Sequence, residues 1–266
     1  MFIPGPTAPA GALSQPWRLP PRGLAVFHGE RHAPRLSHYF MPRLALEGKR
    51  ILFLDGANCV DPRLMARLAE RRGIPFAQFN RQIMMARAFT CFQLTELISR
   101  VPQFLAQFPA EVVMVTAFPE LYFDEDVRPA DATAAFQQAL QALTIADGRL
   151  PIETANHRQF SSIENRPSAI VNSQPVTVAL FSGASGFQPP AGRKLFFAQT
   201  CAAATELWKF QADGEGRLRL TRQDKVLGDG DWEKAEIRKS KFETREASAK
   251  FRVSNFEFRS AIDNRQ

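Results

Sequence analysis

One short segment of the chain has the spacing of a loop that binds phosphate groups. Such a loop reads glycine, four residues, glycine, lysine and then serine or threonine. Its backbone amides surround the phosphate, the lysine neutralises it and the hydroxyl binds magnesium. Here Gly29 is followed at the same spacing by Pro34, Arg35 and Leu36. Because proline has no backbone donor and leucine has no oxygen for magnesium, the segment keeps the spacing but lacks the chemistry.

The basic residues of this segment are the remaining candidates for contact with a phosphate-bearing ligand. Arg35 keeps the positive charge of the usual lysine, although its forked guanidinium group is bulkier. Glu30 opposes such a ligand, because it adds a negative charge where phosphate would lie. We therefore name Gly29, Arg31 and Arg35 as the candidate cofactor-binding residues, and charge alone adds Arg43.

Three histidines near this segment raise the question of a metal site. His28, His32 and His38 could bind a metal together with Glu30. They share no fixed helical face, however, and histidines in such a setting are more often ordinary surface residues. We expect no metal site here, and we interpret the acidic residues 124–126 as a solvated loop.

Two strands and two helices are predicted to alternate in the first half of the chain. The continuous apolar run 51–54 is typical of a strand buried on both faces. Asp61 is placed to cap the helix that follows it. A second apolar run, 83–86, precedes Thr90 and Gln93, which form the pattern of a capping box. Strands that alternate with helices through short connections predict a parallel α/β sheet.

Further elements follow from the same two periodicities. Two more helices are predicted, one over 36–46 and one from Asp131 to Gly148. Buried or alternating apolar residues predict strands over 24–27, 112–115, 151–155 and 176–180, and a hairpin over 207–211 and 217–221. The polar residues 157–173 are predicted to form a loop.

Two phrases of the sequence carry a resemblance to a known family. Leu-Asp-Gly-Ala-Asn-Cys-Val-Asp-Pro at 54–62, followed by Ala-Arg-Ala-Phe-Thr at 86–90, resembles the core of the RecA/RadA-type recombination ATPases. The resemblance extends more loosely over 19–221. It implies a RecA-like P-loop NTPase fold, in which helices flank a mostly parallel central sheet that ends in a C-terminal β-hairpin, and it makes 29–36 a degenerate nucleotide loop (Walker A).

The same resemblance implies two acidic residues that this chain does not have. RadA-like enzymes carry a metal-binding acid at the end of the strand that corresponds to 112–115, where this chain has Thr116. They also carry a glutamate two residues beyond the aspartate that corresponds to Asp55, where this chain has Ala57. Together with Pro34, these changes predict a pseudo-ATPase with no catalytic residue and no cofactor.

The hairpin is the predicted nucleic-acid site. Side chains alternate across a strand, so one face would carry Trp208, Phe210, Leu218 and Leu220. The other face would carry the basic residues Lys209, Arg217, Arg219 and Arg222, which we name as candidate contacts to DNA or RNA phosphates.

Composition separates three regions and narrows the classes of partner. Residues 1–22 form a proline-rich arm, 23–225 the RecA-like core, and 226–266 a basic tail expected to be loosely ordered. A formal net charge of +7 favours polyanionic partners. No apolar run approaches the roughly 20 residues that span a bilayer, and the few, scattered cysteines are typical of the cytoplasm.

These observations leave three functional hypotheses. The first is a non-catalytic RecA/RadA-like protein of DNA repair or recombination that binds DNA, a catalytic RecA-like paralogue or further copies of itself. The second is a divergent DNA-dependent ATPase that binds ATP and Mg²⁺ through an unorthodox nucleotide loop. The third is a protein-interaction inhibitor similar to the SulA-like division inhibitors, which are RecA-like relatives without a P-loop.

Overall fold

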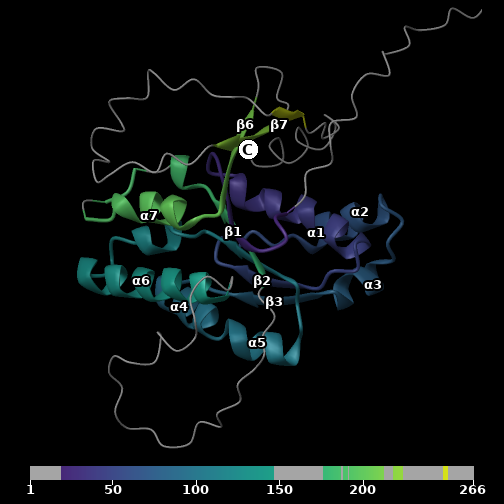
Figure 1. Ribbon diagram of the computed structural model, residues 1–266, viewed down its shortest axis with the longest axis horizontal. Coiled ribbons are helices and arrows are strands. Elements are labelled where there is room, and N and C mark those ends of the chain that lie inside the picture. The colour runs from purple at the N-terminus through teal and green to yellow at the C-terminus, as the bar shows by residue number, and fades with distance from the viewer. Residues whose placement is uncertain are drawn as a thin grey trace, which may run out of the picture.

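A mostly parallel β-sheet runs through the centre of the protein (Figure 1). The computed structural model describes residues 19–146, 176–186, 188–190, 192–212, 218–223 and 248–250. In the described part of the chain the sheet has eight strands in the order β3-β2-β4-β5-β1-β6-β7-β8. The strands are β1 (Gly23–His28), β2 (Ile51–Asp55), β3 (Ile83–Arg87), β4 (Val112–Thr116), β5 (Thr177–Ser182), β6 (Glu206–Ala212), β7 (Leu218–Gln223) and β8 (Ser248–Lys250).

In this order, neighbouring strands from β3 to β6 are parallel to each other. The pairs β6–β7 and β7–β8 are antiparallel. The predicted α/β class, the parallel sheet and the antiparallel β6–β7 pair are therefore confirmed. Every residue of β1, β2, β4 and β5 is buried, as the continuous apolar runs in the sequence predict.

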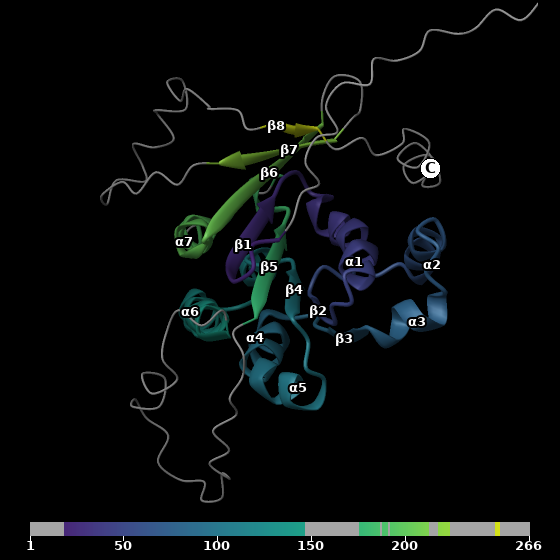
Figure 2. The ribbon, with the colours of Figure 1, turned by 45° about the vertical axis from the view of Figure 1, so that its right-hand side comes forward.

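Helices cover both faces of the sheet (Figure 2). One face is covered by α1 (Ser37–Leu46), which continues the short helix η1 (Ala33–Leu36), and by α2 (Pro62–Glu70) and α3 (Phe76–Arg81). The other is covered by α4 (Cys91–Ser99), α5 (Val101–Gln107), α6 (Pro129–Ala146) and α7 (Leu195–Ala203). Two more short helices, η2 (Glu120–Phe123) and η4 (Ala184–Gly186), follow β4 and β5.

Alternate residues of each buried strand enter the two cores. Leu52 and Leu54 pack towards α4 and α6, whereas Ile51 and Phe53 pack towards α1 and α2. This alternation gives each strand two apolar faces, and it requires helices on both sides of the sheet.

The predicted helix boundaries are mostly confirmed. The Asp61 carboxylate accepts hydrogen bonds from the backbone amides of Arg63 and Leu64, both at 3.0 Å. Thr90 Oγ1 accepts from the Gln93 amide at 3.2 Å, although the Gln93 side chain accepts from Phe89, one residue earlier than a standard capping box requires.

Two predictions about elements need correction. Asp131 does not cap α6, because the helix already begins at Pro129 and places Asp131 in its first turn. Ser248–Lys250, in the predicted tail, pairs with β7 and joins the sheet. The predicted strand 151–155, the loop 157–173, Gly148 and residues 1–18, 224–247 and 251–266 lie outside the described residues, so the division of the chain stays a prediction.

Candidate functional site

The candidate site lies at the edge of the sheet where the parallel strands end. The segments that follow β1, β2, β4 and β5 meet there, and these segments contain the residues singled out in the sequence. In open α/β sheets this edge is the usual place for a ligand, because loops after neighbouring strands converge on it.

Three backbone amides of the loop after β1 donate hydrogen bonds within the chain. The amide of Ala33 donates to the carbonyl of Glu30 at 2.8 Å, and the amide of Arg35 donates to the carbonyl of His32 at 3.1 Å. Gly29 donates to the carbonyl of Ser182 at 3.1 Å. Pro34 has no amide hydrogen to offer. A phosphate would have to displace these hydrogen bonds before it could use the same donors.

Close packing holds the same loop against β5 and β6. A Cβ atom added to Gly183, just after β5, would lie 3.2 Å from the Cα and carbonyl oxygen of Arg31. A Cβ atom added to Gly29 would lie 3.0 Å from Cβ of Phe210 on β6. The hydroxyl of Ser185 also donates to the carbonyl of Gly29. The loop is therefore held by contacts on two sides.

Of the predicted cofactor-binding residues, Gly29 is buried and the side chains of Arg31 and Arg35 are exposed. The Arg35 guanidinium lies 3.9 Å from the Asp61 carboxylate at the start of α2. Arg43, on α1, pairs with Glu47 at 3.3 Å. All three arginines are thus present near the loop, but Arg35 and Arg43 already lie beside carboxylates.

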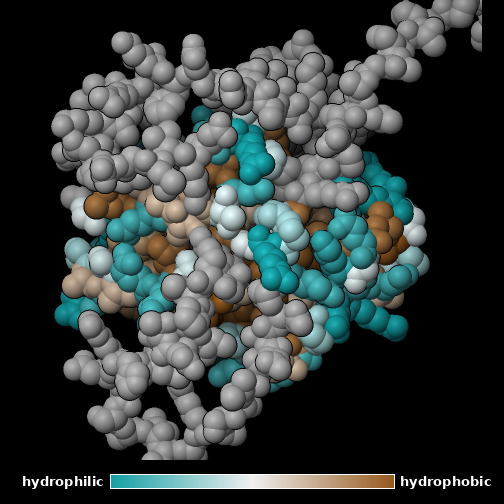
Figure 3. All heavy atoms as spheres, viewed as in Figure 1, coloured by the Kyte–Doolittle hydropathy of each residue, from teal (hydrophilic) through white to brown (hydrophobic). Residues whose placement is uncertain are grey.

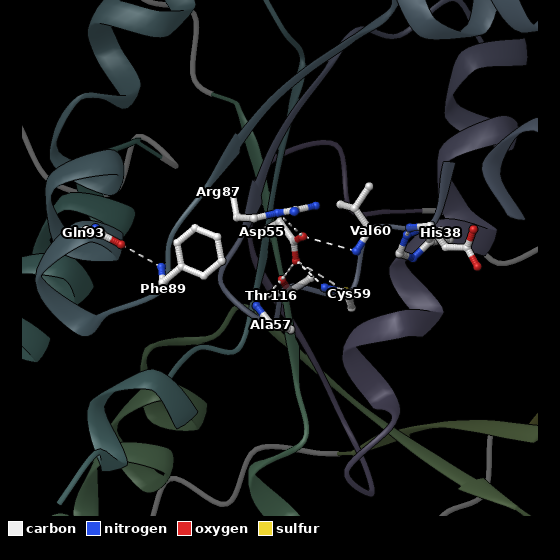
Figure 4. Close-up of polar contacts among 10 residues, drawn as sticks. His38, Asp55, Ala57, Cys59, Val60, Arg87, Phe89, Gln93 and Thr116 are labelled. Carbon is white, nitrogen blue, oxygen red and sulfur yellow. Dashed lines mark hydrogen bonds and ion pairs between the residues drawn. The ribbon is translucent and has the colours of Figure 1, made fainter. Parts of the chain in front are cut away.

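A buried carboxylate at the end of β2 organises the neighbouring loops (Figure 4). Asp55 is fully buried. Its Oδ1 accepts from the Cys59 amide at 3.0 Å and from the Thr116 hydroxyl at 3.1 Å, and its Oδ2 accepts from the Val60 amide at 3.2 Å. The Arg87 Nε atom lies 3.4 Å from Oδ2. Asp55 therefore fixes its own loop to β4 and to β3.

Thr116 and Ala57, which occupy the two acidic positions of the resembling enzymes, are joined to each other. The Ala57 amide donates to Thr116 Oγ1 at 3.1 Å, and the same hydroxyl donates to Asp55. Thr116 is completely buried. A threonine hydroxyl can donate and accept at once, so it links the β2 loop to β4 with hydrogen bonds where an acid would bring a second negative charge.

The histidines near the loop do not come together. His38, on α1, donates from Nδ1 to the Arg35 carbonyl at 2.9 Å and accepts at Nε2 from the Asp61 amide at 3.3 Å. His28, on β1, bonds instead to the side chain of Gln223 at 2.6 Å. Burial lowers the pKa of both imidazoles. Within the described ranges, no three histidine, cysteine or acidic side chains form a group that could hold a metal ion.

A buried carboxyl group beside the loop was not recognised in the sequence. Glu120 Oε1 accepts from the amide of Gly183, and Oε2 is buried without a partner among the described residues. Burial raises the pKa of Glu120 to about 7. In the sequence Glu120 belongs to a segment with several acidic residues, which indicates a solvated loop. Its position between the apolar residues Phe118 and Leu121 could have indicated that the carboxyl group is buried.

The structure divides the predicted nucleic-acid residues between two faces of the hairpin. The register pairs Trp208 with Arg222 and Lys209 with Thr221, so Arg222 does not share a face with Lys209. The Arg222 guanidinium lies 3.4 Å from the Glu206 carboxylate and 6.0 Å from the centre of the Trp208 ring. Its predicted position beside Lys209 is wrong, because residues 218, 220 and 222 alternate together.

The predicted apolar face of the hairpin agrees with the structure at three of its residues. Phe210 and Leu220 are buried against the core on the α1 face, and Trp208 packs beside them. In the backbone register, Arg219 pairs with Gln211, two residues along β6 from Lys209. Arg217 lies outside the described residues.

Neither a test for membrane-spanning helices nor comparison with known proteins identifies the chain. No helix in the described ranges combines the length and the apolar character that a membrane crossing needs. A scan against models of protein families found no family that matches the chain, and a search of the curated proteins found no relative.

Proposed function

We propose that this protein is a non-catalytic relative of the RecA/RadA recombination ATPases, a pseudo-ATPase that acts by binding in DNA repair or recombination. The observation that carries the proposal is the state of the loop after β1. The amides of Gly29, Ala33 and Arg35 donate within the chain, and Pro34 has none. A phosphate cradle made of backbone donors therefore has no ready donors at these positions.

The second support is the chemistry of the metal positions. Thr116 and Ala57 offer a hydroxyl and a methyl group where the resembling enzymes have carboxylates. Magnesium prefers hard oxygen ligands and is usually held by carboxylates together with phosphate oxygens. Without those acids, bound ATP would lack the ion that balances its charge.

The arrangement of the sheet is compatible with the proposed relationship. The resemblance implies a mostly parallel sheet flanked by helices with a C-terminal hairpin, and the strands β1–β6 with the antiparallel β7 agree with that outline. A RecA-like fold and a cytoplasmic location are parts of the proposal.

The partner surface that we propose is the open edge of the sheet at β3. In the described part of the chain, β3 pairs only with β2, so its other edge has backbone groups available for an added strand. Met85 on β3 is 39% exposed, and Phe89 and Phe92 just beyond it are 64% and 50% exposed. Apolar side chains beside an open edge favour an extended partner segment over solvent. We propose that a RecA-like paralogue, or a second copy of this chain, supplies that segment.

Calorimetric titration of the full chain with Mg-ATP tests the first part of the proposal. We expect no saturable heat up to about 1 mM nucleotide, which corresponds to a binding free energy weaker than about −4 kcal/mol. A micromolar Kd that is lost in Arg35→Ala would refute the proposal and favour the hypothesis of a divergent ATPase.

Sedimentation velocity tests the proposed edge. The variant Met85→Arg/Phe89→Ser should abolish self-association, or association with the RecA-type ATPase of the same genome. Leu195→Arg is the control, because Leu195 is 54% exposed on α7, which contacts β1 and lies away from the β3 edge. Equal association of both variants would rule out the β3 edge. Association with a cell-division protein but with no RecA-type ATPase would favour the SulA-like hypothesis.

A further inference from the structure

The outer surface of α1 and α2 carries two rows of side chains that repeat every four residues. Residues four apart lie on the same side of a helix, so each row forms a line along its helix. The rows are Arg35, Tyr39 and Arg43 on η1 and α1, and Arg63, Arg67 and Arg71 on and just after α2. We propose that this surface, which we call the α1–α2 arginine surface, binds the phosphate backbone of a nucleic acid.

The two rows lie side by side and run in the same direction. At their first ends, the Asp61 amide donates to His38 at 3.3 Å, and Arg35 lies 3.9 Å from the Asp61 carboxylate. At their far ends, the pKa of Arg72 is lowered mainly by burial and also by the positive charge of Arg43. Figure 2 shows α1 and α2 as neighbours on the same face of the sheet.

Tyr39 belongs to the first row and is half-buried. Burial is the main cause of its raised pKa, and the charges of Arg35, Arg67 and Arg71 act in the opposite direction. The charges of three guanidinium groups, from both rows, therefore act on one half-buried phenol. A phosphate placed over Tyr39 would meet cations from two helices together with a hydroxyl donor.

Helix α2 has one apolar side and one basic side. Met65, Leu68 and Ala69 are buried against the core. Arg63, Arg67 and Arg71 are exposed on the other side. Like charges four residues apart destabilise a helix, so this spacing is not one that helix stability favours. A bound polyanion would remove that repulsion.

The surface has a clear excess of positive charge. Segments 35–49 and 61–73 contain six arginines and one lysine against three carboxylates, namely Glu47, Asp61 and Glu70. Two of these carboxylates, Glu47 and Asp61, lie at opposite ends of the arginine rows, where they pair with Arg43 and Arg35. In the view of Figure 3, teal hydrophilic residues lie on the right-hand side of the molecule, where Figure 1 labels α2, together with a brown apolar group.

The chemistry of the surface fits a nucleic acid better than a membrane or an acidic protein. Arginine predominates over lysine, and its fork binds two phosphate oxygens at once. Residues four apart are separated by about 6 Å along a helix, so each row can follow a regular line of phosphates. A membrane-bound helix would turn its apolar side outward, but the apolar side of α2 is in the core.

This inference rests on the proposed binding function, and it moves the nucleic-acid contact away from the hairpin. Arg222 on the hairpin already pairs with Glu206 and lies over Trp208. On α2, by contrast, the described residues place no carboxylate within 4.0 Å of Arg63 or Arg67. Arg63 and Arg67 therefore have more capacity for an external anion than Arg222.

Fluorescence anisotropy with a labelled 30-nucleotide single strand and a 30-base-pair duplex tests the inference over 50–300 mM NaCl. The test variant is Arg63→Gln/Arg67→Gln/Arg71→Gln. The control is Arg81→Gln/Arg100→Gln/Arg128→Gln, which removes the same charge from exposed positions elsewhere. We expect the test variant to bind at least about tenfold more weakly at 100 mM salt, and its log–log salt slope to fall by about two. The control should stay within about threefold of the wild type.

Any of the following outcomes would overturn the inference. One is equal binding by both triple variants, and the same holds if the wild type does not bind at 50 mM salt. Another is displacement of DNA by polyglutamate of equal charge at the same concentration, which would indicate an acidic protein partner. The third is binding to phosphatidylserine vesicles without binding to DNA. None of these results concerns Mg-ATP. The proposal that the loop after β1 does not bind this nucleotide is therefore tested separately, by the calorimetric titration. Melting temperatures within about 3 °C of the wild type would confirm that the variants fold.

Discussion

Replacing Thr116 with valine tests how the hydroxyl at the end of β4 joins β4 to β2. Valine keeps the shape of threonine but removes the hydroxyl, which donates to Asp55 and accepts from the Ala57 amide. The change therefore deletes two buried hydrogen bonds at once. It leaves the Ala57 amide without its acceptor, and Asp55 with one donor fewer.

The expected cost follows from the kinds of hydrogen bond that are lost. An unsatisfied buried donor costs about 1–3 kcal/mol, and a hydrogen bond to a charged group contributes about 1.5–3 kcal/mol. Partial relaxation reduces the sum, so we expect Thr116→Val to lower the free energy of unfolding by about 2–4 kcal/mol. For a chain of this size, that corresponds to a fall in Tm of roughly 5–10 °C.

Urea unfolding followed by circular dichroism measures this change. Thr133→Val is the matched control, because the Thr133 hydroxyl bonds only to the Pro129 carbonyl on the exposed side of α6, and we expect a change within about 0.5 kcal/mol. A double-mutant cycle with Asp55→Asn should show a coupling of about 1–2 kcal/mol. If Thr116→Val costs no more than Thr133→Val, or if it adds independently to Asp55→Asn, the reasoning is refuted.

Two further predictions use the same assay. The free energy of unfolding should fall from pH 7 to pH 5. Burial lowers the pKa values of His28 and His38, so the unfolded chain binds protons that the folded chain excludes. Glu120 acts in the opposite direction because its pKa is raised to about 7, so Glu120→Gln should make this fall steeper, and a shallower fall would contradict the burial of that carboxyl. Gly56→Ala should cost about 2–3 kcal/mol or more, because the new Cβ would lie 2.6 Å from the Thr116 carbonyl oxygen, and an unchanged urea midpoint would show that β2 and β4 separate easily.

The elements that local sequence determines were predictable. The run Ile51–Leu54 predicts a buried strand because four consecutive apolar residues leave no polar face, and β2 covers these residues. Asp61 predicts the start of α2 because a short carboxylate can reach the amides of the next turn, and it does so. The loop after β1 could also be located, since its spacing depends only on adjacent residues.

The site itself depends on contacts that local sequence does not contain. The carboxyl group of Glu120 is buried, and its donor is the amide of Gly183, 63 residues away. Arg193 is 2% exposed because its guanidinium donates to the carbonyls of Asp124 and Val127, in a loop that the sequence indicates to be solvated. Similarly, the sequence identifies Thr116 only through the resemblance, whereas its hydrogen bond requires Asp55 from another strand.

The most direct test of the central claim is to observe the loop amides themselves. In ¹H–¹⁵N NMR spectra of the full chain, the amides of Ala33 and Arg35 should exchange slowly with solvent, because both donate to carbonyls of the loop. Addition of Mg-ATP to about 5 mM should leave their chemical shifts unchanged, as expected for a loop whose donors are already engaged. Saturating shifts at Gly29, Ala33 and Arg35 would contradict the account, because they would show that the loop opens and binds the nucleotide.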